Sequence, residues 1–129
     1  MTKLQLAAAA GVTACIALFA TATIAAQQDA EKSAIKDAMK GGFKGDTSYA
    51  KLASTGKATK EEIAKLKAYC ESLCKEKPPV GDDASWKEKT DALTKAVADL
   101  EAGAADAAKN FEKAANCKAC HEVHKPKKK

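Results

Sequence analysis

Apolar residues recur every three or four positions along most of the chain, the spacing of amphipathic helices and not of strands. Four helices are predicted, at about 29–44, 59–77, 85–103 and 105–124. Thr59 with Glu62, and Ser85 with Glu88, form capping-box patterns that predict where the second and third helices begin. Because the links between them are mostly short, we expect an all-α domain folded as an antiparallel four-helix bundle.

The first 26 residues differ in composition from the rest of the chain. Lys3 precedes an uncharged apolar run over 4–26 that ends in small residues, a pattern typical of a secretion signal. We therefore predict a signal peptide at 1–26, a mature domain at 27–129 and export, with no membrane attachment after cleavage. A retained membrane anchor is one alternative, because about 20 apolar residues can span a bilayer. Lipid modification of Cys15 is another.

The charge pattern argues against nucleic-acid binding. All 22 basic residues are lysines, and they alternate with 17 acidic residues, leaving a formal net charge of +5. Such mixing is typical of solvated helical surfaces, and no basic stripe with interleaved aromatic residues is present. The one run of like charge, at 125–129, is interpreted as a solubilising end, with a docking patch as the alternative.

The strongest chemical signal is a C-x-x-C-H arrangement formed by Cys117, Cys120 and His121. Two thiols three positions apart on a helical turn can bond the two vinyl groups of one haem, and the adjacent histidine then reaches its iron. A redox dithiol is an alternative but would be expected in a βαβ context. A zinc site that adds Cys70 and Cys74 would leave His121 unexplained. We predict one covalently attached haem c.

The position of this motif at the end of the chain narrows the class. Only eight residues follow His121, none of them a methionine, and Met39 is the sole methionine after the signal region. A terminal motif on the last helix, a proline-bearing link after the second helix and Trp86 just beyond it resemble the cytochrome c prime family. This resemblance implies a dimeric four-helix bundle with haem on the last helix and His121 as proximal ligand. The family's usual aromatic and arginine after the motif are absent, and His124 is expected to face solvent.

Two further cysteines lie one turn apart near the end of the second helix, a position that the predicted bundle places level with the haem motif. Cys70 lies on the apolar stripe with Leu66 and Leu73, whereas Cys74 lies one position off it. Cys70 is therefore the predicted second iron ligand, with Cys74 as the alternative. Both could instead be small buried apolar residues or form a disulfide.

A narrower resemblance supports thiolate ligation. The segments at 56–59, 77–82, 85–87 and 115–117 are similar to a planctomycete group of small exported cytochromes that includes the paired NaxL and NaxS type subunits of anammox bacteria. The resemblance implies a heterodimer with a related cytochrome subunit and His/Cys haem ligation. It also implies binding of nitric oxide and carbon monoxide, in the periplasm or an equivalent compartment such as the anammoxosome lumen.

These observations lead to a functional hypothesis. We expect a non-enzymatic haem protein for electron transfer with redox partner proteins, for binding of diatomic gases, or for both. A haem enzyme acting on a small nitrogen species is an alternative, although the sequence offers no obvious acid or base beside the haem. A structural subunit of a larger redox complex is a third hypothesis.

Overall fold

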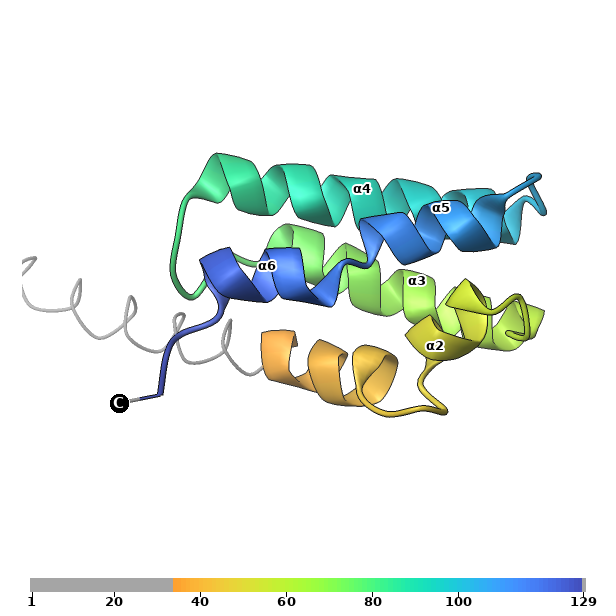
Figure 1. Ribbon diagram of the computed structural model, residues 1–129, viewed down its shortest axis with the longest axis horizontal. Coiled ribbons are helices and arrows are strands. Elements are labelled where there is room, and N and C mark those ends of the chain that lie inside the picture. Colours follow the sequence, from red (N-terminus) through yellow and green to blue (C-terminus); the bar gives the residue numbers. More distant parts are fainter. Residues whose placement is uncertain (1–33, 129) are drawn as a thin grey trace, which may run out of the picture.

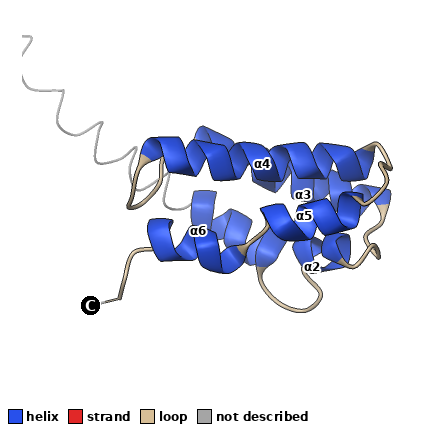
Figure 2. Cartoon of the chain, turned by 45° about the horizontal axis from the view of Figure 1, so that its top comes forward, coloured by secondary structure: helices blue, strands red, loops and turns tan. Residues whose placement is uncertain are grey.

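The computed structural model describes residues 34–128, and the regular elements in that range are all helical (Figures 1 and 2). This confirms the all-α prediction, while the predicted signal peptide lies outside the described residues. No helix within 34–128 combines the length and the apolar character needed to cross a membrane. A helical turn at 34–38 leads into the elements η1 (Met39–Phe43), α2 (Tyr49–Ser54), α3 (Lys60–Lys75), α4 (Asp83–Glu101), α5 (Ala107–Ala114) and α6 (Cys117–His124).

The two longest helices, α3 and α4, lie side by side, and the other elements pack along them (Figure 1). The capping box predicted for α3 is present: Thr59 Oγ1 accepts from the Glu62 amide at 3.3 Å, and Glu62 accepts from the Thr59 amide at 2.8 Å. The start predicted for α4 is wrong. The Asp82 carboxylate accepts from the Ser85 amide at 2.8 Å, so the helix begins at Asp83 and includes Ser85. An acidic cap there satisfies amides that an isolated helix end leaves unpaired.

The predicted last helix is broken in two. α5 ends at Ala114, and the Asn116 side chain then accepts from the Ala119 amide at 3.1 Å and caps a new helix. α6 consequently starts at Cys117. The predicted first helix differs too, because its last turn, η1, is a π-helix, and such turns are frequent at functional sites. The connector expected after it contains the short helix α2.

The core consists of two clusters of buried side chains. The first lies among α2, α3, α4 and α5 and contains Ala53, Leu66, Cys70, Leu93, Ala96, Val97 and Phe111. The second consists of Ala38, Leu73 and Trp86, with half-buried apolar neighbours that include Met39, Phe43 and Cys120. Burying one large apolar side chain contributes roughly 1.5–3 kcal/mol, so each cluster stabilises the packing around it. The second cluster fixes η1 and α6 beside the meeting point of α3 and α4.

Candidate haem-attachment site

The three residues of the C-x-x-C-H motif line one cavity. Cys117, Cys120 and His121 all border a space of about 570 Å³. That volume lies within the range of about 300–1,000 Å³ found for cofactor pockets. Its inner walls are largely apolar side chains and small alanines, including Met39, Phe43, Leu73, Trp86, Leu93, Ala92, Ala114, Ala115 and Ala119. The structure therefore brings the predicted attachment residues to a single apolar-walled space.

The two thiols of the motif differ in environment. Cys117 is exposed in the first turn of α6, and its Sγ lies 3.5 Å from the Ala115 carbonyl oxygen, to which it donates. Cys120 is half-buried against the cluster around Trp86. Burial raises the pKa of the Cys120 thiol, and the positive charge of Lys89 partly offsets that rise. Both are free thiols and both face the cavity.

The two histidines of α6 lie in opposite environments. His121 is exposed and borders the cavity. His124 was expected to face solvent, and that expectation is wrong: it is only 3% exposed. Its Nδ1 lies 3.0 Å from the Val80 carbonyl oxygen, and its Nε2 lies 3.2 Å from Ser85 Oγ. The two histidines lie only about 60° apart around the helix axis. It is the contacts with Val80 and Ser85, at the α3–α4 link and the start of α4, that bury His124.

Cys70 is buried in the first core cluster. It is 0% exposed, and burial raises the pKa of its thiol to about 12. The residues that line the cavity do not include it, but Leu93 belongs to both the cavity wall and the cluster around Cys70. Cys70 thus belongs to the core cluster that supplies Leu93 to this wall, and is not itself part of the wall. Iron ligation by Cys70 would need a rearrangement that brings its thiol into the cavity lining, and it stays a prediction.

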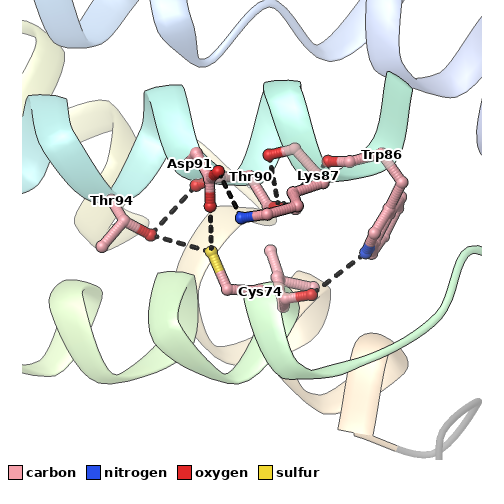
Figure 3. Close-up of polar contacts among 7 residues, drawn as sticks. Cys74, Trp86, Lys87, Thr90, Asp91 and Thr94 are labelled. Atoms are coloured by element: carbon pink, nitrogen blue, oxygen red, sulfur yellow. Dashed lines mark hydrogen bonds and ion pairs between the residues drawn. The ribbon is translucent and has the colours of Figure 1, made fainter. Parts of the chain in front are cut away.

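Cys74 is directed toward polar groups of α4 (Figure 3). Its Sγ lies 3.2 Å from Thr94 Oγ1 and 3.7 Å from an oxygen of Asp91, to which the thiol donates. Lys87 donates to the same carboxylate at 2.6 Å, and this hydrogen bond is the main reason that the pKa of Asp91 is lowered. The cavity lining does not include Cys74. The structure therefore gives Cys74 polar partners outside the cavity.

Met39 is a possible iron ligand that the sequence did not predict, because the methionine ligand of small cytochromes c follows the C-x-x-C-H motif and Met39 precedes it. Met39 begins the π-helical turn η1 and lines the same cavity as His121, from a different wall. Its thioether is a known type of second haem ligand. The available signal was that Met39 recurs at four-residue spacing with Ile35 and Phe43, which placed it on the inner face of the first helix.

A zinc site built from the four cysteines does not agree with this arrangement. Within residues 34–128, no three side chains of histidine, cysteine, aspartate or glutamate gather closely enough to hold a metal ion. Cys70 and Cys74 lie away from the cavity that Cys117 and Cys120 share. The donor set at the cavity, two thiols and an imidazole beside apolar walls, instead fits covalent haem, which needs one axial nitrogen from this helix.

No protein-family model matches the chain, and no curated protein or solved structure matches it.

Proposed function

We propose that this chain is an exported monohaem c-type cytochrome that serves in electron transfer, in binding of diatomic gases, or in both. The observation that carries the proposal is that Cys117, Cys120 and His121 border one apolar-walled cavity of about 570 Å³ in an all-helical domain. Haem supplies an iron that changes between two oxidation states and binds small gases. The residues named here would attach and orient it.

The roles of the motif residues follow from their chemistry. Cys117 and Cys120 would each attach the haem by adding across one of its vinyl groups, with a carbon–sulfur bond formed and the thiol proton passed to the other vinyl carbon. His121 lies one position beyond Cys120 on the same helix and supplies a nitrogen to the iron. Because α6 starts at Cys117 with its own Asn116 cap, these three groups lie on one short helix.

The arrangement of helices supports the cytochrome c prime type of bundle. In that interpretation α3 and α4 are two of the four helices, α5 with α6 forms the last, and the segment at 34–43 belongs to the first. The fourth helix of that bundle would thus be interrupted between α5 and α6, and the first would end in the π-helical turn η1. The resemblance noted in the sequence adds a dimer with a related subunit, and export to the periplasm or an equivalent compartment.

Two residues could supply a second ligand to the iron of the proposed haem. The resemblance to His/Cys cytochromes favours Cys70, whereas the placement of side chains favours Met39, which lines the cavity while Cys70 is not part of its wall. A thioether held at the iron is typical of an electron carrier, and a displaceable ligand or an open position is typical of a gas-binding protein.

The proposal is tested by expressing the full chain with an extracytoplasmic haem-attachment system. Haem that stays with the purified polypeptide through acid-acetone extraction supports it. The double variant Cys117→Ala, Cys120→Ala should lose that haem, while the matched variant Cys70→Ala, Cys74→Ala should keep it. Equal haem retention by both double variants would refute attachment through α6.

A further inference from the structure

The positive charge of the described domain is concentrated at the mouth of the cavity. Residues 34–128 hold nineteen lysines and fifteen acidic residues. The cavity lining contains one acidic residue, Glu88, and five lysines: Lys40, Lys44, Lys89, Lys113 and Lys125. The remaining fourteen lysines and fourteen acids balance, so the whole excess lies at this one opening. We call these five residues the lysine rim.

The lysine rim is not the charged face of a single helix. Its members come from η1 and its end, from α4, from α5 and from the residue that follows α6. Four of the five are exposed, and Lys89 is half-buried. The ion pairs within residues 34–128 involve Lys67, Lys87, Lys95, Lys109 and Lys118, and none involves the lysine rim. The charge at the mouth is therefore available to a partner.

An exposed apolar corner adjoins this region. Val80 and Val123 are the large apolar side chains most exposed among the described residues, at 41% and 44%. They belong to neighbouring backbone segments, because His124 bonds the Val80 carbonyl and a Cβ on Gly81 would lie 2.8 Å from the Val123 carbonyl oxygen. Lys125 follows Val123 by two residues. Apolar contacts flanked by charged groups are the usual anatomy of a protein interface.

We propose that the lysine rim, together with Val80 and Val123, is the docking face for an acidic redox protein. This proposal rests on the proposed function, because electrons would cross where α6 presents the haem. The two propionates of haem would cancel at most two of the four excess charges and leave the face positive. Complementary charge accelerates encounter in low salt and fixes the orientation of the partner.

The first test uses flavodoxin, a small acidic one-electron donor, and maps its docking site directly. A carbodiimide joins lysine amines to carboxylates that touch them, and mass spectrometry of the product identifies the joined lysines. Cross-links concentrated on the lysine rim are expected. An even spread over the lysines of α2 and α3 would overturn the proposal. The map is made on the purified full chain and reports docking independently of electron transfer, so its failure is distinguishable from failure of the proposed function.

The second test measures how fast reduced flavodoxin reduces the ferric protein: the donor loses one electron and the iron gains it. The triple variant Lys40→Gln, Lys44→Gln, Lys89→Gln should slow this reaction roughly tenfold at low ionic strength, with the difference shrinking as salt is added. A matched variant, Lys51→Gln, Lys57→Gln, Lys60→Gln, removes equal charge outside the cavity and should stay within about twofold of wild type. Equal slowing by both variants would show an effect of net charge alone and contradict the proposal.

Discussion

The imidazole of His124 lies 3.2 Å from the hydroxyl of Ser85, measured from Nε2 to Oγ, and so joins the end of α6 to the first turn of α4. The ring of His124 also meets the ring of Trp86 edge-on, with 5.3 Å between centroids. Trp86 in turn donates from Nε1 to the carbonyl oxygens of Leu73 and Glu76 at the end of α3. One buried histidine thus fixes α6, the helix with the C-x-x-C-H motif, to the α3–α4 pair.

The variant His124→Ala should therefore be destabilised. It removes two hydrogen bonds and leaves a gap beside Trp86, and such losses cost about 1–3 kcal/mol in total. Denaturant unfolding measures the change. Glu122→Ala, at an exposed position of the same helix, is the control and should change stability by less than about 0.5 kcal/mol. Equal stability of the two variants would contradict the role given to His124.

Replacing Gly41 or Gly42 by a larger residue should destabilise the protein, although both lie in the helical turn η1. Replacing glycine by alanine inside a helix usually stabilises it by up to about 1 kcal/mol. Here a Cβ on Gly41 would lie 2.6 Å from Cζ of Tyr69, and one on Gly42 would lie 3.0 Å from its Cδ2. We expect Gly41→Ala to destabilise the protein by about 1–3 kcal/mol, as overpacking does.

A double-mutant cycle isolates this contact. If the clash with Tyr69 is the cause, Gly41→Ala should cost little or nothing in a Tyr69→Val background, where the ring is gone. The same cost in both backgrounds would mean that Gly41 is needed for another reason. Since η1 also contains Met39 and Phe43, the close approach of Tyr69 sets where one wall of the cavity lies.

If the chain binds haem as proposed, spectra of single variants of the holoprotein assign the second iron ligand. The cavity lining predicts that Met39→Ala converts ferric iron from low-spin to high-spin and speeds uptake of carbon monoxide. Cys70→Ala should then leave the spectrum nearly unchanged. The reverse result, with loss of a thiolate charge-transfer band in Cys70→Ala, would establish thiolate ligation and require the first core cluster to rearrange around haem.

Stability at alkaline pH separates the same two accounts. Burial raises the pKa of Cys70 from its ordinary 9.0 to about 12. Below pH 9 both the folded and the unfolded chain keep the proton, and Cys70 adds no pH dependence. Between pH 9 and 12 only the unfolded chain loses it, so a free Cys70 lowers the free energy of unfolding by about 1.4 kcal/mol per pH unit.

The comparison uses wild type and Cys70→Ala, each unfolded by denaturant at pH 8 and pH 10. If Cys70 is a free thiol, the loss of unfolding free energy in Cys70→Ala should be about 1.4 kcal/mol smaller at pH 10 than at pH 8. The reason is that only the wild type loses stability through ionisation of Cys70 in its unfolded state. A thiolate bound to iron gives the opposite sign: the folded chain then carries no proton on Cys70 while the unfolded chain carries one below pH 9, so the loss should be about 1.4 kcal/mol larger at pH 10 than at pH 8.

Local sequence signals predicted some features of this fold and missed others for identifiable reasons. The all-α class and the capping box of Thr59 follow from periodicity and spacing, and both are confirmed. The break at Asn116 was missed because alanines continue the helical pattern across it. The burial of His124 depends on Val80 and Ser85, about 40 positions away, and no local pattern records such a contact.

Some residues of the candidate site could likewise be predicted from a local motif, and others could not. The motif of Cys117, Cys120 and His121 is local, and the structure brings its three residues to one cavity. The side of α3 that faces this cavity depends on how the helices pack, and Leu73, not Cys70, lies there. Met39 and the lysine rim also line the cavity, but they come from segments far apart in the chain, so no local pattern groups them.

The most direct test of the central claim is the intact mass of the polypeptide purified after extracytoplasmic expression, compared with that of the Cys117→Ala, Cys120→Ala variant. The account predicts that the wild-type chain, under denaturing conditions, carries the added mass of one haem, and that a fragment spanning 117–121 holds it. The double variant should show the mass of polypeptide alone. A wild-type chain that emerges without added mass while haem separates from it would contradict covalent attachment.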